Sequence, residues 1–134
     1  MVWLSFRFSP KEDECMTLSF CLVAAGGFFG AIARFWVSNR IKRKDASSFP
    51  LATLIVNLVG SFLLGLIIGA NLEHSLQLLL GIGFLGAFTT FSTFKLENIQ
   101  LHAEKKWKTL VLYLGLSYTF GIFLAFIGIL IGRL

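Results

Sequence analysis

One run of twelve residues combines the side chains needed to handle an ion inside a membrane. Residues 83–94 read Gly-Phe-Leu-Gly-Ala-Phe-Thr-Thr-Phe-Ser-Thr-Phe, with two glycines, four hydroxyls and four phenylalanines. Glycine loosens a helix, and hydroxyl groups can satisfy the backbone of a broken one. In lipid each unsatisfied backbone group costs several kcal/mol, so irregular backbone is tolerated only inside protein or beside water. The run is therefore the predicted working part of the chain.

The aromatic residues of this run are regularly spaced. Phe88, Phe91 and Phe94 are three residues apart, so they share roughly one helix face. A packing or lipid-facing role is the default for phenylalanine in a span. The edge of each ring is positive, however, so ring edges with amide donors and hydroxyls such as Ser92 and Thr93 could hold a small dehydrated anion. Such a site has no full positive charge, so the anion can also leave.

Three more polar side chains lie within apolar segments. Asn57 is the lone amide of its segment, and an unpaired amide in hydrocarbon is expensive, so it must face protein or water. It either makes a helix–helix hydrogen bond or directs an NH₂ donor at a passing anion. Tyr113 and Ser117 are four residues apart and share a face. That polar stripe indicates a wet path or interhelical hydrogen bonds.

Two further features concern charge. Arg34 lies near the end of an apolar segment, where it either extends to the membrane interface or attracts anions at a pore mouth. Gly86 and Thr89 lie where the third apolar segment breaks most easily. The carbonyls freed by a break, contributed by two chains, could enclose Na⁺.

The residues that are missing exclude other classes of protein. No carboxylate lies centrally in an apolar segment, and Glu97 falls just past the third one, so a proton-coupled carrier lacks its usual site. The sequence contains no nucleophile–base pair, phosphate loop or metal-ligand cluster, so we predict that the protein is not an enzyme. The net charge of +5 is typical of basic membrane loops and does not indicate nucleic-acid binding.

Four apolar segments position these residues. They cover residues 17–37, 49–70, 76–94 and 109–132, each close to the ~20 residues that a spanning helix needs. The predicted fold is an all-α integral membrane domain over residues 17–134, with four transmembrane helices and the third broken near its middle. Residues 1–16 are predicted to be a tail, either loose or upstream of a translation start at Met16.

Basic residues are unevenly distributed between the two sides of the predicted domain. The first and third loops hold seven, and the other side holds three, namely Arg7, Lys11 and Arg133. The positive-inside rule then places both loops in the cytoplasm and both termini outside. Small-xxx-small pairs such as Gly26/Gly30 and Gly65/Gly69 predict closely packed helices.

Together these residues resemble the Fluc, or CrcB, fluoride channel family over nearly all of residues 17–132. The resemblance rests on Gly26-Gly-Phe-Phe-Gly30 followed by Arg34-Phe35, on Pro50 with the segment around Asn57, and on residues 83–94 followed by Glu97. It implies small four-helix subunits that pair in antiparallel, dual-topology dimers with two fluoride pores. It also implies roles for single residues. Phe91 and Phe94 would form aromatic boxes, Asn57 would be the pore asparagine and Arg34 the vestibule arginine. Tyr113 and Ser117 would belong to a polar track, and the carbonyls of Gly86 and Thr89 would bind a structural Na⁺ at the dimer interface.

The sequence departs from the family pattern at two positions. Gly121 stands where the family often has a hydroxyl, and Lys95 stands where a small polar residue is more usual. Lys95 could attract anions or pair with Glu97, and the sequence does not choose between these roles.

The resemblance implies passive fluoride efflux across the plasma membrane, which lowers cytoplasmic fluoride. The biased loop charges favour a heterodimer with an oppositely oriented homologous subunit, while a homodimer stays open. One alternative is a non-conducting structural subunit. Another, less favoured because an intramembrane carboxylate is missing, is a small dual-topology exporter.

Overall fold

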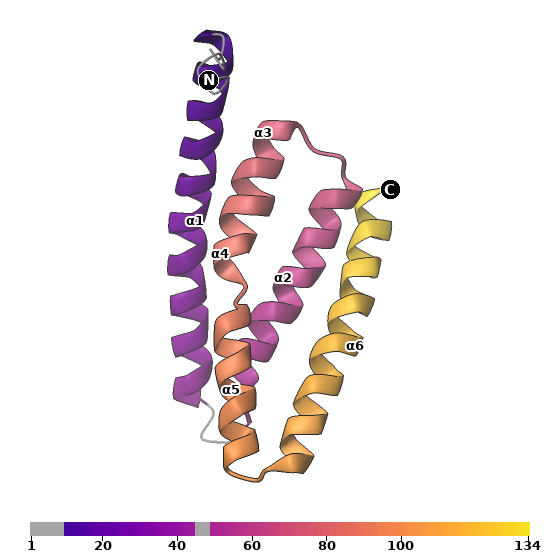
Figure 1. Ribbon diagram of the computed structural model, residues 1–134. Coiled ribbons are helices and arrows are strands. Elements are labelled where there is room, and N and C mark those ends of the chain that lie inside the picture. The colour runs from indigo at the N-terminus through magenta and orange to yellow at the C-terminus, as the bar shows by residue number, and fades with distance from the viewer. Residues whose placement is uncertain (1–9, 45–48) are drawn as a thin grey trace, which may run out of the picture.

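The chain crosses the bundle four times. The computed structural model describes residues 10–44 and 49–134. Three passes are single helices, α1 (Pro10–Lys44), α2 (Leu51–Gly69) and α6 (Trp107–Gly132). The other pass is assembled from α3 (His74–Leu76), the π-helical segment η1 (Gln77–Leu85), α4 (Gly86–Phe88) and α5 (Phe91–Ala103). Figure 1 shows these passes side by side, with the first and last described helices starting and ending at the same end of the bundle.

All four passes suit a membrane by length and composition. The qualifying stretches are Met16–Arg43, Leu51–Gly69, His74–Ala103 and Trp107–Gly132. The prediction of an all-α fold with four spanning helices is therefore confirmed, and the chain is a multi-pass membrane protein.

Helix α1 is longer than the apolar segment that predicted it. It begins at Pro10, where a missing N–H is harmless, so the last part of the predicted tail is helical. Residues 1–9 of that tail lie outside the described residues, and a start at Met16 stays a prediction. The basic residues from Arg40 to Lys44 were expected in a loop and instead form the last turns of α1. Arginine and lysine are good helix formers, so the helix continues through them.

The third pass is broken at two consecutive threonines. Thr89 has φ −75° and ψ 160°, and Thr90 has φ −146° and ψ 122°, so both are extended between α4 and α5. Figure 1 shows this point as a thin segment between the two helices. The Thr90 hydroxyl accepts a hydrogen bond from the Thr93 N–H and so caps the start of α5. The predicted break is thus confirmed and lies at the hydroxyl-rich part of the run.

Glycines allow the closest helix contacts. A Cβ at Gly26 would overlap the Leu79 carbonyl oxygen, and one at Gly65 would overlap the carbonyl oxygen of Ala125. Helix α1 therefore packs tightly on η1, and α2 on α6. The predicted role of the glycine pairs in packing is confirmed.

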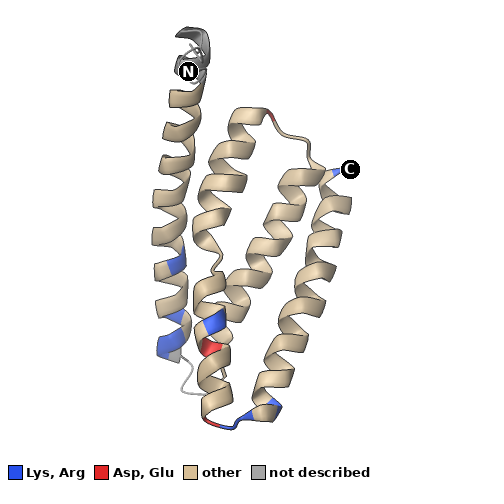
Figure 2. Cartoon of the chain, in the orientation of Figure 1, with Lys and Arg blue, Asp and Glu red and all other residues tan. Residues whose placement is uncertain are grey.

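The buried core is small and the outer surface is apolar. One cluster of buried residues joins α2, α5 and α6 and consists of Leu54, Phe94, Leu101, Leu110 and Tyr113. Another joins α2, η1 and α4 and consists of Val56, Leu85 and Phe88. Many large apolar side chains on α1 and α6 are exposed, among them Phe20 and Ile122. Figure 2 shows the basic segments gathered toward the lower end of the bundle. This pattern is the one expected for helices surrounded by lipid or by another apolar chain.

Candidate functional site

The break in the third pass is held by an amide on α2. Asn57 Nδ2 donates to the Thr90 carbonyl oxygen at 3.0 Å, and Asn57 Oδ1 accepts from the Thr90 N–H at 2.9 Å. Both backbone groups of Thr90 are therefore paired although neither belongs to a helix. The helix–helix alternative for Asn57 is thus present in the structure. Its second Nδ2 hydrogen is left over, because an amide NH₂ carries two.

A cavity of about 430 Å³ opens beside this break, between α2, the third pass and α6. It is lined by residues from all three passes, and its lining contains no Lys, Arg, Asp or Glu. Six of the residues predicted from the sequence meet here: Asn57, Gly86, Thr89, Phe91, Phe94 and Ser117. The structure thus brings the break, two aromatic rings, an amide and a hydroxyl to one uncharged, largely apolar hollow.

The two predicted pore aromatics differ in burial. Phe91 is 67% exposed, whereas Phe94 is buried at 7% and contacts the rings of Tyr113 and Tyr118. Their ring centroids are 6.2 Å apart with an interplanar angle of 30°. Phe94 is therefore a fixed wall of the cavity, and Phe91 is its outer rim, open to whatever covers the chain on that side.

The hydroxyls that follow the break bond mainly to one another. Thr90 Oγ1 lies 3.1 Å from Thr93 Oγ1 and 3.3 Å from Ser92 Oγ. Neither Ser92 nor Thr93 lines the cavity. In this single chain they support the N-terminus of α5, and their predicted place along a pore stays a prediction.

Tyr113 belongs to a site that the sequence did not predict. Its side chain is fully buried, and its hydroxyl donates to Glu97 Oε2 at 2.8 Å. Thr53 Oγ1 donates to the other oxygen, Glu97 Oε1, at 2.7 Å. The sequence placed Glu97 just past the third apolar segment, whereas the structure has it inside the spanning stretch His74–Ala103, toward the C-terminal end of that stretch. The expectation failed because α5 continues well past the apolar run that defined the third segment.

The predicted polar stripe of α6, which includes Ser117, lies beside a hydroxyl of α2, that of Ser61. Among the described residues, Ser117 Oγ is buried and has no hydrogen-bond partner, and Ser117 is one of the residues that line the cavity. The next position on that face is Gly121, which lacks a hydroxyl. A Cβ there would lie 3.8 Å from Ser61 Oγ, and Ser61 also lines the cavity. The sequence motif around Asn57 included Ser61 without assigning it a role.

Arg34 and the carbonyls at the break lie close together. Arg34 Nη1 is 3.5 Å from the Thr89 carbonyl oxygen, so the guanidinium reaches the break from α1. In an unbroken helix the Gly86 carbonyl would accept from the Thr90 N–H, but that N–H donates to Asn57. The Gly86 carbonyl therefore loses its usual partner.

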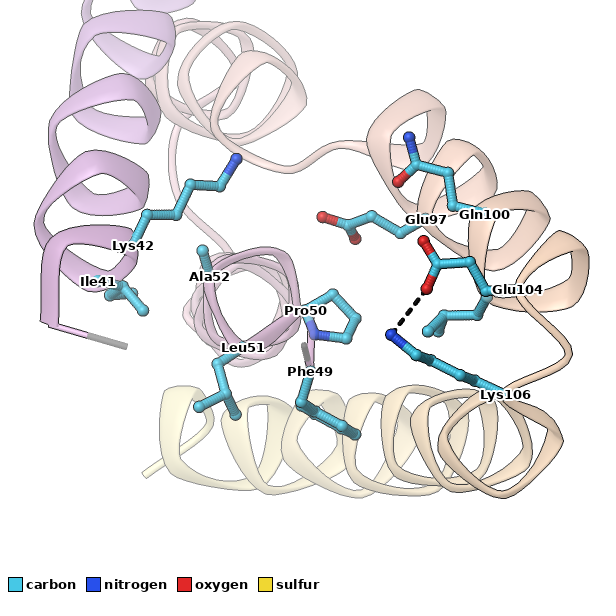
Figure 3. Close-up of a pocket in the computed structure, with 11 residues that line it drawn as sticks. Ile41, Lys42, Phe49, Pro50, Leu51, Ala52, Glu97, Gln100, Glu104 and Lys106 are labelled. Atoms are coloured by element: carbon cyan, nitrogen blue, oxygen red, sulfur yellow. Dashed lines mark ion pairs between the residues drawn. The ribbon is translucent and has the colours of Figure 1, made fainter. Parts of the chain in front are cut away.

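A second cavity, of about 320 Å³, opens at the end of the bundle where the basic residues gather. Figure 3 shows Lys42 of α1 and Glu97 of α5 directed into this opening, with Pro50 at the start of α2 beside them. Glu104 and Lys106 form an ion pair of 2.7 Å at its edge. Glu97 is thus reached from this cavity on one side and bonded to Tyr113 on the other.

Fold and site together define a class: small multi-pass membrane proteins with a broken span beside an uncharged cavity. Comparison with known proteins gives the family. Residues 21–129 match the model of the CrcB-like protein, Camphor Resistance (CrcB) family, so the chain belongs to this family.

Its relatives cover most of the chain. Fluoride-specific ion channel FluC 2 of Bacillus cereus is 56% identical over 111 residues, 83% of this chain and 94% of the relative. Fluoride-specific ion channel FluC 1 of Geobacillus kaustophilus is 50% identical over 111 residues, 83% of this chain and 95% of the relative. Fluoride-specific ion channel FluC 1 of Listeria monocytogenes serotype 4b is 43% identical over 117 residues, 87% of this chain and 99% of the relative. The predicted family is confirmed.

Proposed function

We propose that this chain is a subunit of a fluoride-selective channel in the plasma membrane, which lowers cytoplasmic fluoride by passive efflux. Its relatives are named fluoride-specific ion channels and match nearly their whole length. The observation that carries the proposal is the neutral cavity in which Phe91, Phe94, Asn57 and Ser117 meet at a broken span. Channels are not enzymes, and this activity requires no bond chemistry from the protein.

The driving force comes from the membrane. Hydrogen fluoride crosses lipid as a neutral molecule and ionises inside, where the pH is higher. An interior-negative potential then favours exit of the anion by ~2.3 kcal/mol per charge per 100 mV. No ATP or proton coupling is needed, because the pore only has to let the anion pass.

Selectivity follows from weak donors placed around a narrow path. A small anion in the cavity would meet the positive edges of Phe91 and Phe94, the second Nδ2 hydrogen of Asn57 and the hydroxyl of Ser117. Fluoride is the smallest halide and the strongest hydrogen-bond acceptor among them, so such donors favour it. The absence of a formal charge in the cavity lining keeps binding weak enough for release.

The carbonyls at the break fit a structural sodium ion. The Gly86 carbonyl has lost its helical donor, and within the described part of the chain the Thr89 carbonyl accepts a long bond from Arg34. Two such carbonyls from each of two subunits would give Na⁺ four oxygen ligands and supply a fixed positive charge at the interface. The nearby guanidinium opposes this cation. We therefore expect removal of the Arg34 charge to strengthen sodium binding.

A second subunit would complete the path. Phe91 is largely exposed and the cavity opens at the surface of the single chain, so another chain is needed to enclose an anion there. The bias of basic residues favours an oppositely inserted homologous subunit, and a homodimer of the same chain is the alternative.

A small dual-topology exporter is the second candidate, because Glu97 supplies the intramembrane carboxylate that such a carrier needs. Both of its oxygens accept hydrogen bonds from neutral hydroxyls, which suits a structural carboxylate as well.

Efflux from liposomes separates these functions. The protein, purified through a tag together with any subunit that accompanies it, is reconstituted and fluoride release is followed with an electrode. If the protein is a channel, the liposomes release fluoride and retain chloride, provided that a counter-ion can cross the membrane to balance the charge. Release that requires a proton gradient would favour the carrier, and no fluoride release would overturn the proposal.

A further inference from the structure

Lys95 is a cation inside a membrane span. It lies on α5 within the stretch His74–Ala103, five residues after Thr90. At 1.5 Å per residue it is about 7.5 Å along the helix axis from the break. A charged side chain at that depth is costly and therefore needs a physical reason.

The described residues offer Lys95 no counter-ion. Lys106–Glu104 is the ion pair found among them, and Lys95 is in none. Glu97, two residues away, uses one oxygen for Thr53 and the other for Tyr113. Of the two roles that the sequence left open for Lys95, pairing with Glu97 is therefore absent from the structure.

The partner of Lys95 is an aromatic ring at the edge of the cavity. Lys95 Nζ lies 5.9 Å from the centroid of Phe91, within cation–π range. Phe91 is 67% exposed and lines the cavity at the break. A cation over one ring face draws electron density toward itself, so the hydrogens at the ring edge become more positive.

We propose that Lys95 determines the fluoride affinity of the path, by placing a positive charge over the Phe91 ring whose edge meets the anion. The inference rests on the proposed function and adds a residue to it. The ammonium acts through the ring and through its own field, without touching the anion. It therefore raises the local concentration of fluoride at the outer rim of the cavity without creating a tight binding site.

The size of the effect follows from Coulomb's law. A unit charge about 10 Å from the anion, at an effective dielectric constant of about 20, changes a binding equilibrium about tenfold. In the competing account Lys95 extends along its apolar stem to the membrane surface, where water screens its charge and fluoride affinity is independent of it.

The first test replaces the charge and keeps the stem. In liposome efflux, Lys95→Met should raise the half-saturating fluoride concentration about tenfold, while Lys95→Arg keeps it near wild type. Lys108→Met is the matched control, because Lys108 is an exposed lysine in the first turn of α6 and does not line the cavity. Equal affinities for wild type and Lys95→Met would overturn the inference.

A second test adds charge to the folded protein. In a background with Cys15→Ser and Cys21→Ser, Lys95→Cys is labelled with an aminoethyl, a methyl or a sulfonatoethyl methanethiosulfonate. The aminoethyl label should restore the affinity, the methyl label should leave it low and the sulfonatoethyl label should lower it further. Equal fluoride affinities of the three labelled proteins, with fluoride efflux still present, would contradict the inference. A wild-type protein without fluoride efflux would instead overturn the proposed function itself.

Discussion

At the scale of single residues, the site depends on one amide. Asn57 pairs both backbone groups of Thr90, and without it an N–H and a carbonyl would be left unpaired inside the span. Asn57 also lines the cavity, together with Phe91 and Phe94. One side chain therefore both pairs the backbone at the break and lines the cavity.

Asn57→Leu keeps a side chain that branches at Cγ and removes both hydrogen bonds. Each unpaired backbone group costs about 1–3 kcal/mol, so we expect a lower thermal stability in detergent and loss of fluoride efflux. Asn71→Gly is the control, because Asn71 is a loop amide with φ 47°, which glycine adopts freely. Wild-type efflux from Asn57→Leu would show that the break does not need this clamp.

The proposed binding of sodium also depends on single residues. Arg34→Gln removes the guanidinium near the Thr89 carbonyl, so the protein should need less Na⁺ to reach full thermal stability. Arg40→Gln, which changes an arginine over the Trp36 ring instead, serves as the control. Stability that is independent of Na⁺ in every variant would contradict the proposed cation site.

At the scale of elements, three helices meet at one carboxylate. Glu97 of α5 accepts from Thr53 of α2 and from Tyr113 of α6, so it fixes the lower half of the third pass against both neighbours. Glycines fix the remaining contacts, because α2 and α6 approach so closely that a Cβ at Gly128 would overlap the Phe62 carbonyl oxygen.

A double-mutant cycle measures the coupling at Glu97. Tyr113→Phe and Thr53→Val each remove one donor, and because they share a carboxylate their stability costs should be non-additive by about 0.5–3 kcal/mol. The control cycle pairs Thr53→Val with Tyr118→Phe, since Tyr118 shares no hydrogen bond with Glu97 among the described residues. Equal coupling in the two cycles would contradict the shared site.

The close contact of α2 and α6 makes a second prediction at this scale. Gly128→Ala should destabilise the protein by about 1–3 kcal/mol, because the helices must move apart. Gly115→Ala on the same helix adds a Cβ that meets nothing within 4 Å, so it should be tolerated. Equal melting temperatures for the two variants would argue against tight packing.

The break could be predicted because its cause is local, whereas its supports are not. Glycines and hydroxyls within residues 83–94 indicated irregular backbone, and the extended residues are Thr89 and Thr90. Asn57 and Glu97 have partners more than fifteen residues away, so the sequence left the role of Asn57 open and placed Glu97 outside the span. The length of an apolar segment predicts a membrane span well. The segment ends at the first polar side chains, however, even where the helix continues.

At the scale of the whole molecule, charge sets orientation and the apolar surface requires a covering. Most of the basic residues gather toward one end of the bundle, which we expect to be cytoplasmic (Figure 2). If this chain inserts in a single orientation, an antiparallel pair requires a partner subunit that inserts in the opposite orientation.

Thiol labelling tests the orientation. In a background without native cysteines, Asn71→Cys should react with an impermeant reagent from outside the cell, because the loop between α2 and α3 carries no basic residue. Changing Lys105, Lys106 and Lys108 to Gln should weaken the bias and give a mixture of orientations. Equal labelling from both sides in the unaltered chain would favour a homodimer of dual topology.

The central claim is that fluoride passes along the rings beside the broken span, and efflux from matched ring variants tests it most directly. Phe91→Ile and Phe94→Ile remove ring edges from the cavity, whereas Phe123→Ile changes an exposed α6 ring outside it. We predict that both cavity variants lose fluoride efflux while still eluting as intact complexes, and that Phe123→Ile conducts like wild type. Unchanged fluoride efflux in both cavity variants would contradict the account.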